Sequence, residues 1–285
     1  MQFNSPLRYP GGKARLSQYV AELLALNSMV GARYAEPYAG GAGVALTLLY
    51  REYVSHIHLN DLNRSVHAFW WAATHATDRL CARVLDCQLD IDEWQRQRAV
   101  QRADEPDVED LAFSTLYMNR TNRSGVVRGG VIGGLKQDGP WKMDARFNRA
   151  DIVKRIEKVG NFASRITISR LDALEFLKSG LPPESTPTLV YLDPPYFKKA
   201  DKLYDNHYKA EDHVSLASAV ASIPHRWIVS YDCHDEICDL YKAYTQQQFG
   251  ISYSAGPVAK GKEVMIFGPG VKRPADIVTW RGIAA

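Results

Sequence analysis

Four consecutive residues, Asp193-Pro194-Pro195-Tyr196, combine an acid, two prolines and an aromatic ring directly after an apolar run, residues 188–192. Two prolines in a row fix the backbone and remove two N–H donors, so the nearby carbonyl groups stay free as acceptors. A carboxylate, a carbonyl and a ring complement the two N–H donors and the flat face of an exocyclic amine on a nucleobase. A motif this short also occurs by chance, as a turn that ends a strand and exposes a tyrosine.

A second candidate site is the small-residue turn Glu36-Pro37-Tyr38-Ala39-Gly40-Gly41-Ala42-Gly43. Its glycines would let a cofactor approach the backbone closely where a helix begins. Asp61 ends the next expected strand, 25 positions after Glu36, and an acid near this offset commonly accepts hydrogen bonds from ribose hydroxyls. The turn lacks the G-x-G-x-x-G spacing and could simply serve packing, but together with Asp61 it favours a cofactor that contains a nucleoside.

The sequence Pro10-Gly11-Gly12-Lys13 resembles part of a phosphate-binding loop but does not meet its requirements. Leu7 stands where such a loop needs its first glycine, and Ala14 replaces the Ser or Thr that would bind magnesium. An NTPase is therefore disfavoured. Taken alone, Lys13 could equally be a solvated surface residue.

The composition narrows the class of protein. The 285 residues are 46% hydrophobic and 24% charged with a formal net charge of +3, which is typical of a globular protein. No apolar run approaches the roughly 18 residues of a membrane-spanning helix, and residues 1–6 lack the basic and apolar regions of a secretory signal. We therefore expect a cytoplasmic protein. Because no C-x-x-C pair or metal-binding histidine motif is present, we expect no metal site and four free thiols, at Cys81, Cys87, Cys233 and Cys238.

Short β-rich runs alternate with helical stretches along most of the chain, which predicts an open, mostly parallel α/β sheet. Strands are expected at residues 33–36, 55–61, 165–172, 188–192 and 226–232, with a closing hairpin near 249–254 and 264–267. Helices are expected at residues 44–53, 173–178 and 210–223. Open α/β sheets bind their ligands at the carboxyl ends of the strands, so the turn at residue 193 would face the ligand.

Residues 65–149 have a different character. Residues 65–119 read as helices without an intervening strand, at 68–73, 80–102 and 108–118. Residues 119–149 hold six glycines and seven basic side chains against two acidic ones, so this segment carries a charge of +5 and the rest of the chain −2. A loop of about 30 residues without structure of its own is uncommon unless it binds a partner or is disordered. Nucleic-acid contact and a solvated charged loop both remain open.

Four motifs in this order resemble the Dam-type DNA adenine-N6 methyltransferases over nearly the whole chain. Residues 9–13 are similar to the N-terminal cofactor motif of that family, 36–41 to its glycine-rich loop, 60–63 to its ribose-binding acid and 193–196 to its catalytic tetrad. The chain departs from the family at Tyr9, where a Trp is usual. It departs again at residues 126–130, which follow the Asn-Arg start of the recognition hairpin but do not match the members that read GATC, so no GATC target is implied.

The resemblance implies a Rossmann-like methyltransferase sheet with helices on both faces and an inserted helical and loop target-recognition domain. Residues 1–64 and 150–285 would form the catalytic domain, and residues 65–149 the insertion. S-adenosylmethionine would be the cofactor and double-stranded DNA the partner, with no metal. The implied catalytic residues are Asp193, Pro194, Pro195 and Tyr196. The implied cofactor contacts are Tyr9, Gly12, Lys13, Glu36, Pro37, Gly40, Asp61, Asp172 and Asp193, and the implied DNA contacts are Arg120, Asn122, Arg123 and Arg128.

The expected reaction is methyl transfer to the N6 amine of adenine in site-specific fashion. Asp193 and the Pro194 carbonyl would each accept one N6–H, so that the nitrogen lone pair points at the sulfonium methyl, and the base would flip out of the duplex to stack on Tyr196. Two alternatives remain open, namely cytosine-N4 methylation, whose amine offers the same donors, and a non-enzymatic DNA-binding protein. A dinucleotide-dependent oxidoreductase fits less well. We expect a monomer, while the target sequence and any companion restriction nuclease stay undefined.

Overall fold

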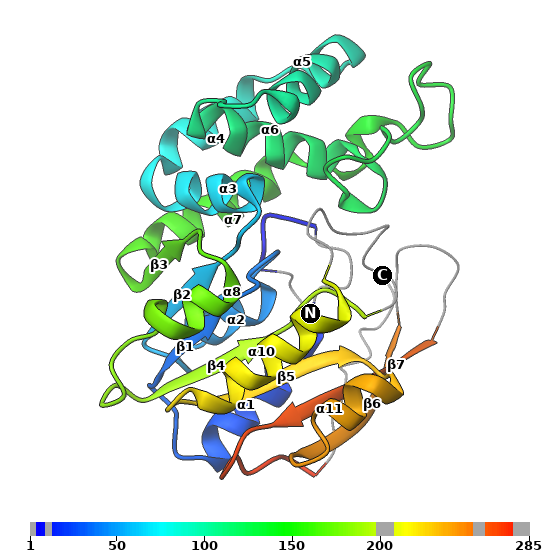
Figure 1. Cartoon of the computed structure of the whole chain (residues 1–285). Coiled ribbons are helices and arrows are strands. Elements are labelled where there is room, and N and C mark those ends of the chain that lie inside the picture. Colours follow the sequence, from blue (N-terminus) through cyan, green and yellow to red (C-terminus); the bar gives the residue numbers. More distant parts are fainter. Residues whose placement is uncertain (1–3, 9–12, 198–207, 253–259, 276–285) are drawn as a thin grey trace. The chain divides into compact units, whose positions relative to one another are not determined.

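The computed structural model describes residues 4–8, 13–197, 208–252 and 260–275. The chain forms two compact units (Figure 1). Among the described residues, the first unit holds 13–62, 169–197, 208–252 and 260–275, and the second holds 4–8 and 63–168.

The first unit is built on a seven-stranded sheet, in the order β3-β2-β1-β4-β5-β7-β6, to which β3 contributes only Ser169 from this unit. Its strands are β1 (Arg33–Glu36), β2 (His56–Asn60), β3 (Ile166–Ser169), β4 (Thr188–Leu192), β5 (Arg226–Asp232), β6 (Thr245–Ser252) and β7 (Lys260–Phe267). Strand β1 pairs in parallel with β2 and β4, β4 in parallel with β5, and β7 runs antiparallel to both β5 and β6. The strand order reverses between β1 and β4, which makes this a Rossmann-like sheet with its switch point there.

Helices cover both faces of this sheet (Figure 1). They are α1 (Ser17–Leu26), α2 (Gly43–Tyr50), α8 (Ala173–Glu175), α10 (Ala210–Ser222) and α11 (Asp235–Leu240), with a 3-10 turn at Ala14–Leu16 and a π turn at Phe176–Gly180. Leu216 and Val220 of α10 pack with Val190 of β4 and Trp227 of β5 in one hydrophobic cluster.

Strand β4 is buried at all five positions, which explains why its sequence is continuously apolar. Burying one such Val or Leu side chain stabilises the fold by about 1.5–3 kcal/mol. The strand is therefore a rigid support for the residue that follows it, Asp193.

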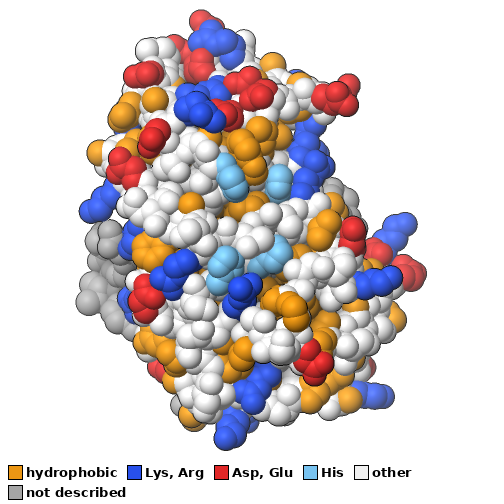
Figure 2. Space-filling model, turned by 90° about the vertical axis from the view of Figure 1, so that its left-hand side faces the viewer, with side chains coloured by type: hydrophobic (Ala, Val, Ile, Leu, Met, Phe, Trp, Pro, Cys, Tyr) orange, Lys and Arg blue, Asp and Glu red, His pale blue; other side chains and the backbone are white. Residues whose placement is uncertain are grey.

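The second unit is helical, with α3 (Arg64–His75), α4 (Thr77–Asp86), α5 (Ile91–Arg102), α6 (Val108–Thr121) and α7 (Arg149–Asn161), and 3-10 turns at Arg123–Gly125 and Met143–Arg146. Helix α6 packs against α3 and α5, and α7 packs against α3 and α4. Side-chain oxygens of Asn63, Asp90, Asp107 and Asn148 cap four of these helices at their first turns. Acidic and basic side chains lie side by side over the helices of this unit in Figure 2.

Most expected elements are confirmed, and β4 and β5 have the bounds predicted from the sequence. The single helix expected over residues 80–102 is wrong, because the chain breaks after Asp86 and restarts at Ile91, where Asp90 caps α5. Helices α1, α7 and α11 were not predicted. The second compact unit runs to Ile168, because Ile152, Ile156 and Val159 bury one face of α7 inside it.

The four cysteines are free thiols, as expected. Within the part of the chain that the structure describes, no helix is long and apolar enough to cross a membrane.

Candidate active site

Three acids meet the carboxyl edge of the sheet at its switch point. Glu36 ends β1, Asp61 directly follows β2 and Asp193 directly follows β4. Strand β1 pairs with β2 on one side and with β4 on the other, so these three positions belong to neighbouring strands. This is the edge at which open α/β sheets bind ligands.

The turn after β1 is held by side chains from the end of β2. The backbone N–H of Gly40 donates to Asp61 Oδ2 over 2.8 Å. The buried amide of Asn60 donates to the Pro37 carbonyl over 3.0 Å, and its oxygen accepts from the N–H of Leu171 over 2.9 Å. Asn60 therefore ties together the loops that follow β1 and β3.

Small residues let the chain turn tightly here. Gly40 and Ala42 have φ values of +44° and +47°, in the left-handed region, and α2 begins immediately after them. A Cβ on Gly43 would lie 2.8 Å from the Cβ of Ala14, so glycine allows the first turn of α2 to contact the segment that follows Lys13.

Glu36 is buried, and its side chain forms hydrogen bonds inside the turn that follows β1. Its Oε1 accepts from the Tyr34 hydroxyl over 2.9 Å and from the N–H of Ala45 over 3.3 Å. Burial raises the pKa of Glu36 to about 8, so the side chain is mostly protonated at neutral pH. A neutral, hydrogen-bonded carboxyl group links β1 to the start of α2.

Lys13 lies at the centre of a buried polar network. Its Nζ is 3.0 Å from Glu263 Oε1, 3.2 Å from Asp193 Oδ1 and 3.2 Å from the Tyr196 hydroxyl. The Tyr196 hydroxyl also donates to Glu263 Oε1 over 3.1 Å. Burial by itself lowers the pKa of Lys13, but the two carboxylates outweigh burial and hold the pKa above its usual value, so the ammonium stays charged.

Two residues of this network, Glu263 and Ser230, were not found by sequence reasoning. Glu263 is fully buried on β7, and Ser230 on β5 donates to Asp193 Oδ1 over 2.7 Å. The one available signal was an acid, Glu263, directly before the apolar run at residues 264–267. That signal becomes meaningful only when the antiparallel pairing of β7 with β5 places the acid beside Asp232.

The turn at residues 193–196 is anchored at both ends. Ser230 and Lys13 hold Asp193, and the backbone N–H of Phe197 donates to Asp232 Oδ1 over 3.1 Å. The Phe197 ring lies 4.9 Å from the His234 ring. Tyr196 is buried, and the hydrogen bond from its hydroxyl to Glu263 also fixes its side chain.

Comparison with known protein families identifies the family to which the chain with this set of site residues belongs. The model of the D12 class N6 adenine-specific DNA methyltransferases matches residues 9–253. The chain belongs to this family. The resemblance stated from the four motifs is therefore confirmed, and the enzyme methylates the N6 amine of adenine in DNA. The family assignment removes the cytosine-N4 and non-enzymatic alternatives.

Solved structures add only weak likeness to the D12-class enzyme. An uncharacterised protein from Listeria monocytogenes serotype 4b is 9% identical, with 92% of this chain and 70% of that chain covered and a TM-score of 0.37. The rRNA methyltransferase aviRa from Streptomyces viridochromogenes is 12% identical, with coverages of 91% and 86% and a TM-score of 0.39. No curated protein matches the chain.

The remaining residues expected to bind the cofactor of the D12-class enzyme have varied surroundings. Tyr9 and Gly12 lie outside the described residues. Asp172 accepts from the N–H of Leu174 over 2.9 Å and caps α8. Pro37 takes part through its carbonyl. Within the described ranges, no three His, Cys, Asp or Glu side chains gather as a metal ion would require.

Two of the four expected DNA contacts of the D12-class enzyme are buried in the second unit. The Arg120 guanidinium donates to the Pro6 carbonyl, and burial lowers the pKa of Arg120 to about 10. Asn122 is fully buried, accepts from Trp94 Nε1 over 2.7 Å and donates to the Val127 carbonyl over 2.8 Å. In this structure both side chains are buried and bonded inside the second unit, and the expectation that they contact DNA stays a prediction.

Arg123 and Arg128, the other two expected DNA contacts, are exposed. The backbone N–H of Arg123 donates to the Gly130 carbonyl over 3.0 Å. This bond closes a loop over residues 123–130, which carries both arginines. The buried Asn122 side chain and this backbone bond therefore hold the short loop that carries the two guanidinium groups.

Proposed function

We propose that this enzyme transfers the methyl group of S-adenosylmethionine to adenine N6 at specific sites in double-stranded DNA, as a cytoplasmic monomer. The orientation of Asp193 carries the proposal. Ser230 and Lys13 both bind its Oδ1, whereas Oδ2 has no partner among the described residues, and the side chain is 27% exposed. A carboxylate anchored through one oxygen can accept an N6–H with the other and keep its position.

Adenine N6 is a poor nucleophile, because its lone pair is delocalised into the ring. When Asp193 Oδ2 accepts one N6–H and the Pro194 carbonyl accepts the other, the nitrogen is held pyramidal and its lone pair has a fixed direction. S-adenosylmethionine would supply a methyl group on a positively charged sulfur: the bond from N6 to the methyl carbon forms as the bond from sulfur breaks, the neutral thioether leaves, and one N6 proton is released to solvent. The protein aligns the two reactants and provides preorganised charges and dipoles. These two effects lower the activation barrier at a site that forms no covalent intermediate.

The turn after β1 suits a nucleoside cofactor. Gly40 and Ala42 present backbone with little side-chain bulk, and half-buried Asp61 stands at the end of the neighbouring strand. We assign Asp61 to the ribose hydroxyls. Glu36, Pro37 and Asp172 support the loops of this edge, and the contacts proposed for Tyr9 and Gly12 rest on the family resemblance.

Asp61→Ala is expected to weaken S-adenosylmethionine binding by about 1.5–3 kcal/mol, the contribution of a hydrogen bond to a charged group. This corresponds to roughly a 10- to 100-fold rise in Kd. Titration calorimetry measures it directly. Asp61→Asn keeps an oxygen that can accept the Gly40 N–H but removes the charge. Its affinity for S-adenosylmethionine should therefore lie between those of the wild-type enzyme and Asp61→Ala. Equal affinities of all three proteins would contradict the assignment.

Arg123 and Arg128 are proposed to contact DNA. We expect that replacing at least one of them by Ala costs about 1–3 kcal/mol at a single base position and relaxes specificity there. Methylation of a library with randomised sites measures this preference. Arg120→Ala is the matched control, because loss of its bond to Pro6 should lower the melting temperature and leave the preference unchanged. If Arg123→Ala and Arg128→Ala lower the methylation rate equally at all sites, both arginines bind the phosphate backbone of DNA and do not read its sequence.

The proposed function is tested by incubating the protein with double-stranded DNA and methyl-labelled S-adenosylmethionine. Digestion to nucleosides should recover the label in N6-methyladenosine, at one sequence context. Label in N4-methylcytosine would overturn the assignment of the base, and N6-methyladenine without a sequence context would overturn site specificity.

A further inference from the structure

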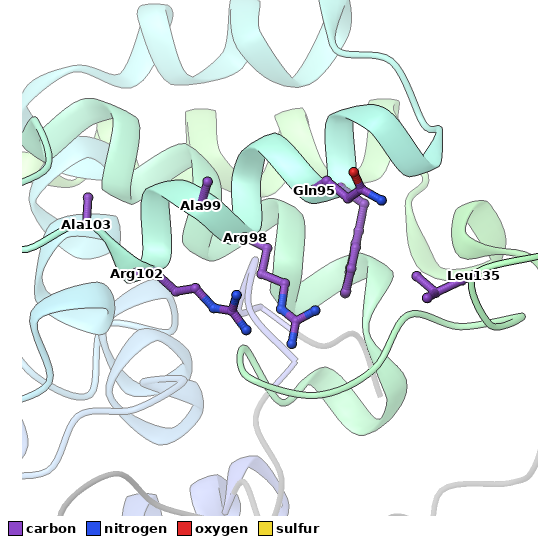
Figure 3. A pocket seen from close by; sticks show the side chains of 7 residues that line it. Gln95, Arg98, Ala99, Arg102, Ala103 and Leu135 are labelled. Atoms are coloured by element: carbon purple, nitrogen blue, oxygen red, sulfur yellow. The ribbon is translucent and has the colours of Figure 1, made fainter.

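A second polyanion-binding surface is suggested by an open pocket on α5 of the second unit, with a volume of about 500 Å³ (Figure 3). Six residues of α5 and its end, together with one residue of the cationic segment 119–149, line it: Trp94, Gln95, Arg98, Ala99, Arg102, Ala103 and Leu135. We call this pocket the α5 groove. Its lining holds two guanidinium groups and no acid.

The two arginines of the α5 groove stand one helical turn apart and extend from the same side of the helix (Figure 3). Within the described part of the chain, neither Arg98 nor Arg102 has a carboxylate within ion-pair distance. Like charges at this spacing destabilise a helix by about 0.2–0.5 kcal/mol. An anion bound between them would offset that repulsion.

Four other arginines of this unit are paired with acids, whereas the two of the α5 groove are not. The pairs join Arg79 to Glu109, Arg83 to Asp110, Arg96 to Glu93 and Arg155 to Asp151. The α5 groove thus holds two exposed guanidinium groups that no carboxylate of the described residues neutralises. Arg102 is also favoured by its place in the last turn of α5, next to the negative end of the helix dipole, but Arg98 is not.

Arg98 is held in place before any ligand binds. Its guanidinium carbon lies over the Trp94 ring, 5.1 Å from the ring centroid. Trp94 is itself buried, and its indole N–H donates to Asn122 Oδ1 in the recognition loop. A cation fixed over a rigid ring loses less conformational entropy on binding, and its N–H fork can still bind a phosphate bidentately.

The shape of the groove suits a chain of phosphates better than one small anion. Ala99 and Ala103 are small and exposed, so they leave space beside the arginines. Leu135 borders the groove and comes from the cationic segment 119–149. We propose that the α5 groove binds phosphodiester groups of the DNA substrate through Arg98 and Arg102, in addition to the contacts of Arg123 and Arg128. This inference rests on the proposed double-stranded DNA substrate.

The test compares the double variant Arg98→Gln/Arg102→Gln with the wild-type enzyme in binding to duplex DNA between about 50 and 200 mM salt. Loss of two phosphate contacts should reduce the slope of log K against log salt by about 1.8, since each contact contributes about 0.9. Site preference and kcat at saturating DNA should not change. Arg96→Gln is the matched control, because Arg96 is on the same helix but is paired with Glu93 and does not line the groove.

The outcomes separate this inference from the proposed function. Failure of the wild-type enzyme to bind and methylate duplex DNA would refute the proposed function itself. Normal wild-type methylation with an unchanged slope in the double variant would refute only the α5 groove. A change of preference at one base would also refute it, because the groove would then read sequence. If the Gln variant is less stable, Arg98→Lys/Arg102→Lys must restore the slope, since the salt dependence counts neutralised phosphates and an ammonium group neutralises one as a guanidinium does.

Discussion

Asp193→Ala is expected to lower kcat by about 10²- to 10³-fold even with DNA and cofactor both saturating. Oδ1 of this side chain is fixed by Ser230 and Lys13, and Oδ2 is the oxygen proposed to accept an N6–H. Alanine removes the acceptor that sets the direction of the nitrogen lone pair, so the loss falls on the chemical step and not on binding. Single-turnover methylation of a duplex, with both affinities measured separately, checks this result.

Two variants of the same network give graded controls. Ser230→Ala removes one anchor of Oδ1 but leaves the carboxylate, so its loss of kcat should be smaller than that of Asp193→Ala. Tyr196→Phe keeps the aromatic ring and removes the hydroxyl bonds to Lys13 and Glu263, so it should retain much of the activity. Near-normal turnover by Asp193→Ala would mean that the tetrad is only a structural turn.

The sheet and the Asp-Pro-Pro-Tyr turn that follows β4 were predictable because their signals are local. A continuous apolar run predicts a strand buried on both faces, and β4 has this property at every position. The rigid Asp-Pro-Pro-Tyr turn after it needs no knowledge of distant residues. The same reasoning located Gly40 and Asp61, and the structure joins them by a hydrogen bond.

The interior polar contacts were not predictable, because they depend on residues far apart in the sequence. Arg120 was read as a DNA contact from its charge and its glycine-rich surroundings, yet its guanidinium binds Pro6, more than a hundred positions away. Charge alone does not distinguish an arginine that binds an internal carbonyl from one that binds a phosphate. Glu263 was missed for the same reason, since its partner Lys13 lies at the opposite end of the chain.

Glu263→Gln is expected to lower kcat by about 10- to 100-fold, with a smaller effect on the KM for DNA. The substitution preserves shape but removes one of the two carboxylates that hold the Lys13 ammonium. A hydrogen bond to a charged group contributes about 1.5–3 kcal/mol, and each 1.4 kcal/mol is a factor of ten. Without Glu263, Lys13 is free to shift toward Asp193 and disturb the anchored Oδ1. Glu175→Gln, at an exposed position of the same unit, should have no effect.

The dependence of kcat on pH distinguishes a positioning role of Glu263 from a merely structural one. The pKa of Lys13 is raised in the folded protein, so the stability from its charged form is fully present below the usual value of 10.5 and is lost only as pH rises through the raised pKa. Glu263→Gln removes one of the carboxylates that raise this pKa, so the alkaline loss of activity should begin at a lower pH than in the wild-type enzyme. A folded Glu263→Gln enzyme with normal kcat and an unshifted alkaline limb would show that Glu263 only fills space beside β5.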